Sequence, residues 1–334
     1  MSSYLLSEED EKTHKPSEHK NFNESVYVNG IDHKTRSGLW MRLGNRLNEG
    51  YAELQLCFYL PDGRLACQFQ RPSISNNESF SAGGMTYTVD KPLQAVSMDY
   101  SGEVMVLDDL NLLRDPKRLF TESTKEKIEI TSSLAALSPV HGGEPANDEQ
   151  PTMYGRDFSL GHFFQQMRTN AKIKLGADTY EIDGFGWRDH SWGPRYWTNI
   201  HFYRLLIVNF DNGDGFTMLK ITDRDGVTRR CGVMNIAGCN EDITDVDLFT
   251  EWSAEKDPVK ITLGLRTAKR SAVMHGTVTT MAPLRNRRKL DTGELLETRI
   301  AEGFTEWSWG DVKGFGLSEY IERIEDGQPV GYPL

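Results

Sequence analysis

Hydrophobic and polar residues alternate with a period of two along much of the chain, which is typical of β-strands with one buried face. Clear examples are Ser25–Gly30, Leu39–Leu43, Ala52–Leu60 and Leu65–Phe69. The last two runs are separated by Pro61-Asp62-Gly63-Arg64. This is a strong turn signal, because proline presets the first corner and glycine tolerates a positive φ at the third. The sequence therefore predicts a hairpin at this point.

Further runs of the same kind continue towards the C-terminus, and no long amphipathic helix interrupts them. They are Met85–Val89, Leu93–Tyr100, Glu103–Leu107, Tyr180–Trp187, Tyr196–Phe210, Phe216–Ile221, Val227–Val233, Val259–Leu265, Ala272–Val278, Arg299–Trp309 and Gly316–Ile324. Alternation fades from residue 111 to 127, where Leu110–Pro116 could form a short helical turn. Residues 138–152 are rich in Pro, Gly and acidic residues and predict a long loop. Many short strands joined by turns indicate barrels or sandwiches.

We therefore expect an all-β protein with few short helices, built from two β domains. The 334 residues are enough for two domains with real cores. We expect residues 1–20 to be a flexible lead-in, residues 21–175 the first domain and residues 176–334 the second.

Composition and charge exclude several classes of partner. The net charge of −11 argues against nucleic acid, which needs a basic surface, and against an anionic membrane surface. No run of about 18 apolar residues predicts a membrane anchor, and the polar start lacks the apolar core of a signal peptide. A cytoplasmic location is the default. The four cysteines, Cys57, Cys67, Cys231 and Cys239, lack CxxC spacing and are expected to be reduced and mostly buried.

Residues 182–197, IDGFGWRDHSWGPRYW, combine aromatic and ionisable side chains more densely than any other stretch. The aromatic members include Trp187, Trp192, Tyr196 and Trp197, and the ionisable ones Arg188, Asp189, His190 and Arg195. Glycines and Pro194 would break a regular strand here. A strand that ends in such residues is a candidate for the wall of a ligand pocket, which is mostly apolar with a few convergent polar groups.

Proton transfer is the chemistry that suits this segment. Asp189 beside aromatic faces would be desolvated, which makes a carboxyl group a usable acid, and His190 titrates near neutral pH. Adjacent residues on a regular strand point to opposite faces, so these two share a pocket only if the strand bulges. Tryptophan faces can stabilise a developing carbocation. Hydration, dehydration, isomerisation or cyclisation of an alkene would use such a set.

A purely structural role is the alternative. Arg188 and Asp189 could form a salt bridge, and Trp192 and Trp197 could be ordinary core residues. His162 lies in a further predicted strand, where alternation puts His162, Phe164 and Gln166 on one face and Phe163, Gln165 and Met167 on the other. It is either a satisfied, half-buried histidine or a second functional one.

Other chemistries lack their sequence signals. No HxxxH or HExxH pattern predicts a metal site, and the glycine pairs near residues 184 and 213 lack the helix that a phosphate site needs. Ser191 lacks the G-x-S-x-G context of a nucleophile. We therefore expect no metal and no cofactor.

The run Gly184–Arg195 resembles the G-x-G-x-RDHSWG-x-R signature of AttH-like proteins, which belong with the hydroxyneurosporene synthase (carotenoid 1,2-hydratase) superfamily. Weaker matches lie at Asn48–Gly50, Gly161–Phe163 and Gly316–Tyr320. The resemblance implies two lipocalin-like β domains packed together, with a hydrophobic pocket, and no cofactor. The superfamily includes carotenoid hydratases, hydratases of prenylated isoflavonoids and Diels–Alderase-type cyclases.

Carried over to this chain, the resemblance implies that Asp189 is the acid, with His190 and Arg188 as its tuning partners. The expected substrate-binding residues are Trp187, Trp192, Tyr196, Trp197, Arg195 and His162. The predicted function is a cofactor-independent, acid-catalysed hydratase, lyase or isomerase acting on a hydrophobic isoprenoid-like or polycyclic molecule.

Two alternatives stay open: a non-catalytic carrier of a hydrophobic ligand, and a pericyclase that acts by shape. The expected partner is a hydrophobic small molecule, with no nucleic acid and no stable membrane anchor, and a homodimer is an option. A carboxyl group at Asp189 that is locked to Arg188 or Arg195 would count against the acid, because such a pair depresses its pKa.

Overall fold

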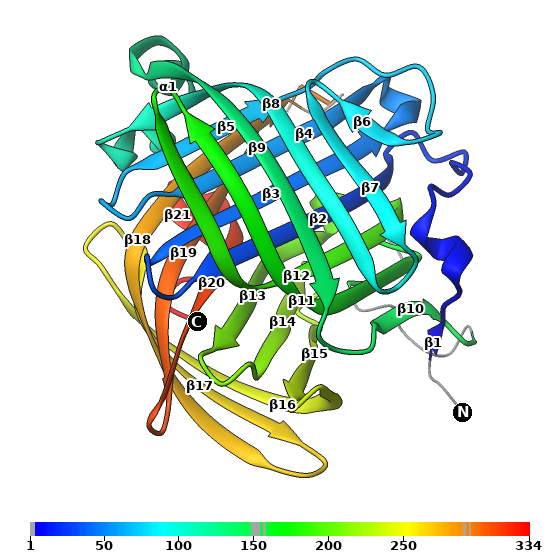
Figure 1. Ribbon diagram of the computed structural model, residues 1–334, viewed down its shortest axis with the longest axis vertical. Coiled ribbons are helices and arrows are strands. Elements are labelled where there is room, and N and C mark those ends of the chain that lie inside the picture. Colours follow the sequence, from blue (N-terminus) through cyan, green and yellow to red (C-terminus); the bar gives the residue numbers. More distant parts are fainter. Residues whose placement is uncertain (1–3, 148–153, 156–157, 290–291, 294) are drawn as a thin grey trace. The chain divides into compact units, whose positions relative to one another are not determined.

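The computed structural model describes residues 4–147, 154–155, 158–289, 292–293 and 295–334, and most of these lie in β-strands (Figure 1). The prediction of an all-β fold with few short helices is confirmed. The chain forms two compact units. Unit 1 consists of Met1–Pro61, Ala66–Val106 and Thr124–Trp197, and unit 2 of Asp62–Leu65, Leu107–Ser123 and Thr198–Leu334.

Unit 1 is one large antiparallel sheet that closes on itself. Its strands are β1 (Tyr4–Leu5), β2 (Phe22–Asp32), β3 (Ser37–Arg46), β4 (Tyr51–Tyr59), β5 (Leu65–Gln70), β6 (Phe80–Ala82), β7 (Met85–Lys91), β8 (Ala95–Leu107), β9 (Thr124–Ala136), β10 (His141–Pro145), β11 (Gly161–Leu175) and β12 (Asp178–Pro194). The pairing order runs β11-β12-β2-β3-β4-β5-β8, and β9 pairs with both β8 and β11. This double pairing closes the ring.

The core of unit 1 lies on the inner face of this ring, to which each strand contributes apolar residues at alternate positions. Val26 and Val28 of β2, Met41 of β3 and Ile182 of β12 belong to one buried cluster. We use the term inner face for the side of the sheet that carries this cluster, and outer face for the opposite side. Because side chains alternate along a strand, the core residues fix which face every neighbour occupies.

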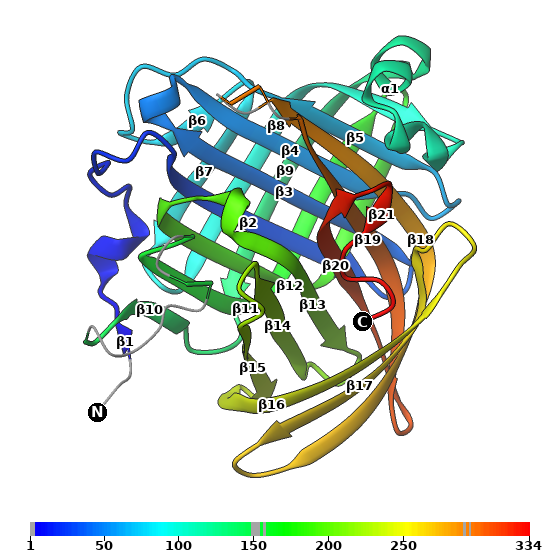
Figure 2. The same ribbon diagram turned by 180° about the vertical axis from the view of Figure 1, so that it is seen from behind.

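Unit 2 contains a second closed sheet, seen from the other side in Figure 2. Its strands are β13 (Ile200–Phe210), β14 (Gly215–Asp223), β15 (Thr228–Ile236), β16 (Cys239–Trp252), β17 (Pro258–Thr267), β18 (Ser271–Lys289), β19 (Leu295–Trp309), β20 (Val312–Glu325) and β21 (Gln328–Pro329). Consecutive strands pair, and β13 also pairs with β20, which closes the barrel. Its core includes Leu206, Phe216, Trp307 and Tyr320.

The helices are short. They are the 3-10 turns η1 (Glu8–Glu11), η2 (Leu47–Glu49), η3 (Leu110–Arg114) and η4 (Trp197–Asn199), and the α-helix α1 (Pro116–Glu122). The turn expected at Leu110–Pro116 is present as η3 and the start of α1. Asp115 caps α1 by accepting hydrogen bonds from the backbone of Lys117 and Arg118, and Pro116 fits the first turn, where a backbone donor would have no partner.

Three expectations about the organisation of the chain need correction. A boundary at residue 175 would cut the β11–β12 hairpin, whose strands pair from Leu175↔Asp178 onwards, so the change of unit falls at Trp197 instead. The lead-in is not a free tail, since Glu11 is only 1% exposed. The expected loop at 138–152 contains β10, and its last five residues, 148–152, lie outside the described residues.

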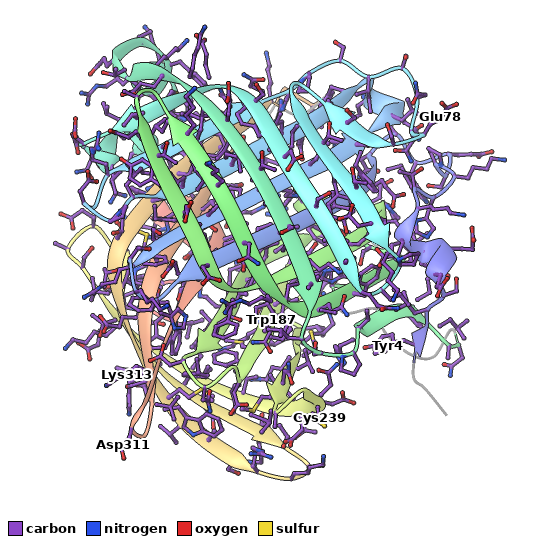
Figure 3. The ribbon with its side chains drawn as sticks, viewed as in Figure 1. Tyr4, Glu78, Trp187, Cys239, Asp311 and Lys313 are labelled. Carbon is purple, nitrogen blue, oxygen red and sulfur yellow. The ribbon has the colours of Figure 1, made fainter. Side chains whose placement is uncertain are left out.

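Two further properties can be compared with the sequence. Among the described residues, no helix has the length and apolar character needed to span a membrane. The four cysteines are free, as expected; Cys57 and Cys67 are buried, whereas Cys239 at the start of β16 is exposed (Figure 3).

Candidate active site

The segment that the sequence singled out lies at the end of β12, where the strand is regular. β12 pairs with β11 without a register shift from Leu175↔Asp178 to Gly161↔Trp192. Alternate residues therefore point to opposite faces: Arg188, His190 and Trp192 inwards, and Trp187, Asp189 and Ser191 outwards. The bulge that would bring Asp189 and His190 to one pocket is not formed.

Arg188 is saturated with partners on the inner face. Its Nη1 and Nη2 donate to the two carboxylate oxygens of Glu11 at 2.8 and 2.7 Å, and Nη1 also donates to Tyr87 Oη at 3.0 Å. Nε and Nη2 donate to Gln165 Oε1 at 2.9 and 2.7 Å. Burial alone would disfavour the charge, but Tyr87 and Glu11 outweigh it and raise the pKa of Arg188. Arg188 thus holds η1 against the sheet and does not contact Asp189.

His190 is also engaged on the inner face. Its Nε2 lies 2.6 Å from Glu24 Oε1, and the same carboxylate oxygen lies 3.0 Å from His14 Nδ1. Burial would raise the pKa of Glu24, but hydrogen bonds from the two histidines lower it. Burial would lower the pKa of His14, but Glu24 and Asp10 raise it. This chain of contacts binds the N-terminal segment to β2 and β12, and leaves His190 away from Asp189.

Trp192 is the third residue of this segment that points to the inner face. Its ring stacks on His14 with centroids 4.0 Å apart, and its indole N–H donates to Glu144 at 2.8 Å. It belongs to a small buried cluster with Phe22 and Phe163. The structure therefore places Arg188, His190 and Trp192 in the packing at one end of unit 1.

On the outer face, Asp189 lies beside His162. Asp189 Oδ1 is 3.7 Å from His162 Nε2; the aspartate side chain is 17% exposed and the histidine side chain 2%. Burial lowers the pKa of His162, and the neighbouring carboxyl group offsets this only in part. His162 Nδ1 is buried and has no hydrogen-bond partner among the described residues. Strand alternation predicted that His162 shares a face with Phe164 and Gln166, and the register puts this face on the same side as Asp189.

Aromatic rings surround this pair. The His162 ring lies 4.2 Å from that of Phe164 and 4.8 Å from that of Tyr154, measured between centroids. Tyr154 in turn packs against Phe158 at 5.3 Å. An acid–base pair in such surroundings can transfer a proton to a hydrophobic molecule and shield the positive charge that develops.

Arg195 approaches the same face from the end of β12. Its Nη2 donates to Ser191 Oγ at 2.7 Å, and its guanidinium carbon lies 4.5 Å from the centre of the Phe158 ring. Ser191 Oγ is also 3.0 Å from Ser25 Oγ. Neither Arg188 nor Arg195 locks the Asp189 carboxyl group in an ion pair, so the arrangement that would have argued against an acid is not found among the described residues.

The other predicted aromatic residues differ in position. Trp187 is on the outer face with Asp189 and is 1% exposed (Figure 3). Trp197 is half-buried and contacts Phe158, with ring centroids 4.9 Å apart. Tyr196 is 37% exposed and its hydroxyl group lies 3.1 Å from His19 Nδ1, so it is not placed beside the Asp189–His162 pair.

A set of potential metal ligands is present where sequence spacing indicated none. Donor atoms of His14, Glu24 and His190 lie within 4.8 Å of one another on the inner face. Two imidazoles and a carboxylate are ligands that zinc accepts. In this arrangement, however, Glu24 is at hydrogen-bond distance from both rings. The other ring nitrogen of His190, Nδ1, is buried and has no hydrogen-bond partner among the described residues.

Unit 2 contains a second buried carboxyl group that sequence reasoning missed. Glu302 of β19 is 3% exposed and pairs directly across the sheet with Glu319 of β20. Burial and the charge of Glu319 raise the pKa of Glu302 well above its usual range. The hydroxyl group of Tyr203 donates to Glu319. Two facing glutamates on paired strands are separated by 17 positions in the sequence, so only correct strand pairing would have revealed them.

The family model of a domain of unknown function, DUF7064, matches residues 7–324. The chain belongs to this family. In a comparison with curated protein sequences, nothing matches this DUF7064 protein.

Solved structures place the DUF7064 chain within a known fold. A protein from Nitrosomonas europaea assigned as AttH is 13% identical, with a TM-score of 0.60, over 95% of this chain and 96% of that one. CghA in complex with Sch210972 is 9% identical (TM-score 0.59; 99% and 98%), and kievitone hydratase from Nectria haematococca is 11% identical (TM-score 0.55; 90% and 88%). The resemblance to AttH-like proteins is thus confirmed at the level of the fold.

Proposed function

We propose that this protein is an acid–base enzyme of the hydratase, lyase or isomerase type that acts on a hydrophobic, isoprenoid-like or polycyclic small molecule. The observation that carries the proposal is the Asp189–His162 pair on the outer face of unit 1. The fold supports it, because kievitone hydratase has the same fold. Fold alone does not define a reaction, so the proposal rests on the pair.

The two members of the pair have different roles. Asp189 is the more exposed and delivers the proton, whereas His162 lies behind it and orients the carboxyl group. Burial lowers the pKa of His162, which favours the neutral imidazole as the partner that orients the carboxyl group. Arg188 and His190, expected as tuning partners, act on the opposite face.

In hydration, the O–H bond of the Asp189 carboxyl group breaks as a C–H bond forms at one alkene carbon. Water then adds through its oxygen to the other carbon, and the proton it releases returns to Asp189. Dehydration is the reverse, and isomerisation loses a different proton from the same cation. Positioned proton transfer of this kind contributes about 10² to 10⁴ in rate.

The test is Asp189→Asn, assayed with a panel of prenylated and polycyclic compounds by mass spectrometry for gain or loss of one water, or for a rearranged product of unchanged mass. The variant should lose about 10²-fold or more in kcat while its unfolding transition is unchanged. Asp183→Asn is the matched control, because Asp183 lies on the same strand and face but is paired with Arg168 at the surface. It should be as active as the parent.

Three outcomes would contradict the proposal. Full turnover by Asp189→Asn, together with loss of turnover in Glu302→Gln, would show that the acid is Glu302 in unit 2. A cyclisation rate that is the same in both variants and in the parent would indicate a pericyclase that works by shape. Saturable binding with no product from any compound that binds would indicate a carrier.

A further inference from the structure

Three arginine side chains gather on the outer face of unit 1, next to Ser191. Arg42 and Arg46 come from β3 and Arg195 follows β12. We call them the arginine cluster. Arg46 is 0% exposed and Arg195 8%, and the Arg42 side chain is 14% exposed. Arginines are rarely buried to this degree unless they are fully paired.

The pairing in the arginine cluster is incomplete. Arg46 Nη1 and Nη2, Arg195 Nε and Asn23 Nδ2 are all buried, and none of these atoms has a hydrogen-bond partner among the described residues. An unsatisfied buried donor costs about 1–3 kcal/mol, and more on a charged group. Several such donors in one place indicate a ligand that accepts hydrogen bonds.

Compensation of charge differs within the arginine cluster: burial would lower the pKa of Arg46, but Glu53 and Glu49 raise it. Glu49 accepts from Arg46 Nε at 2.5 Å, and Glu53 lies 3.3 Å from Arg42 and 4.0 Å from the more exposed Arg71. Four guanidinium groups thus share two carboxylates. Burial, together with repulsion by Arg42 and Arg46, lowers the pKa of Arg195 to about 10, although Asp189 acts in the opposite direction. An added anion would relieve this repulsion.

Gly44 lets the side chains of Arg42 and Asn23 approach the backbone of β3 closely. A Cβ atom on Gly44 would lie 2.9 Å from Arg42 Nη2 and 3.0 Å from Asn23 Oδ1. The guanidinium group of Arg42 therefore lies directly over the backbone of β3. Gly193, which also has no side chain, is the register partner of Asn23 on β12.

The arginine cluster adjoins the Asp189–His162 pair. Arg195 is anchored to Ser191, whose register partner on β11 is His162. Arg195 is also close enough for its charge to contribute to lowering the pKa of His162. A molecule held by the arginine cluster would have its remaining atoms beside the proposed acid.

We propose that Arg46, Arg195 and Asn23 bind an acidic group of the substrate, a carboxylate or a phosphate, so that the substrate class is a hydrophobic acid. This deepens the proposed function and rests on it for the reaction, but the binding step can be tested by itself. Planar guanidinium groups suit both anions, because they present paired N–H donors at the spacing of two oxygens.

The test is calorimetric titration of the full chain with three probes that share one hydrocarbon chain: geranic acid, geranyl phosphate and geraniol. One or both acids should bind at least about tenfold more tightly than the alcohol, the value of one charge-assisted hydrogen bond. The stronger of the two acids identifies the head group. Equal binding of the acids and the alcohol would overturn the proposal.

Variants locate the site. Arg195→Met should remove the preference for acids, whereas Arg118→Met, which removes an exposed arginine paired with Glu122, should keep it. Asn23→Asp places a carboxylate of the same shape in the cluster. It should raise the unfolding temperature by neutralising the arginines and abolish acid binding, an outcome that a merely structural asparagine would not produce. Acid binding that survives both Arg195→Met and Asn23→Asp would refute the site.

Failure of this inference can be told from failure of the proposed function. Asp189→Asn should bind the acid at least as tightly as the parent, since one negative charge near Arg195 is removed, yet should not convert its substrate. Acid-selective binding without any turnover would support the proposed binding site and contradict the proposed enzymatic function. Turnover of neutral substrates alone would support the proposed enzymatic function and contradict the proposed binding site for an acidic group.

Discussion

The ionisable side chains on the two faces of β12 differ in how completely they are paired. On the inner face, Arg188 and His190 each have short, charge-assisted contacts with a glutamate. On the outer face, Asp189 has one contact at 3.7 Å and Arg195 keeps a donor without a partner among the described residues. Removal of one partner from a buried ion pair destabilises a structure, whereas a buried donor without a partner is available to a ligand. Adjacent positions in one motif thus serve structure and chemistry separately.

The largest expected effect lies on the inner face. Glu11→Ala leaves the Arg188 guanidinium group buried without its counter-charge, and removal of one partner from a buried pair costs about 3–5 kcal/mol. Urea unfolding should show this loss. Glu9→Ala, which breaks an exposed pair with Lys12, should cost less than about 1 kcal/mol. Equal effects of the two substitutions would mean that η1 does not hold unit 1 together.

The next effect depends on pH. Because the pKa of His14 is raised on folding, its bond to Glu24 stabilises the protein fully below the unfolded value near 6.5 and is lost as the pH rises through the folded pKa. Because the pKa of Glu24 is lowered, its contribution is lost only as the pH falls below about 4.

His14→Gln should therefore lower the unfolding free energy by about 1.5–3 kcal/mol at pH 6, the value of a hydrogen bond to a charged group, and by clearly less at pH 9. Denaturant titrations at the two pH values measure the difference. A deficit that is the same at both would show that His14 acts through packing against Trp192 alone.

The smallest effect is expected at Tyr196, which the sequence placed among the substrate-binding residues. Its hydroxyl group contacts only the exposed His19 in the described contacts, so Tyr196→Phe should change stability and turnover by less than about 0.5 kcal/mol. Thermal melts and steady-state rates check this. A large loss of turnover would show that Tyr196 takes part in the reaction. It would also weaken the contrast between the structural inner face and the chemical outer face.

Strand alternation predicted the faces correctly but not the partners. It put His162 and Phe164 on one face of β11 and warned that Asp189 and His190 would separate without a bulge, as they do. It could not identify Glu11 or Glu24 as partners, because these lie 177 and 166 positions from Arg188 and His190. Such contacts depend on strand order, which a periodic pattern does not encode.

Among the strands that the sequence did not predict, the two longest, β9 and β16, were missed for local reasons. In β9, Ser132 occupies an inward position where an apolar residue is expected, and it is 4% exposed because its hydroxyl group bonds to the backbone of Met98. In β16, a register shift between Ile243 and Asp245 breaks the period of two. A buried polar residue and a bulge each erase the alternation on which a strand prediction depends.

The bond between Glu11 and Arg188 has a consequence for protein synthesis. The ribosome makes Glu11 177 positions before its partner Arg188. At about 5–20 residues per second, Glu11 waits on the order of ten seconds or more before Arg188 exists. Until then the carboxylate lacks this guanidinium partner, and η1 is not held to β12. A nascent chain paused before residue 188 is thus the species that a chaperone would meet.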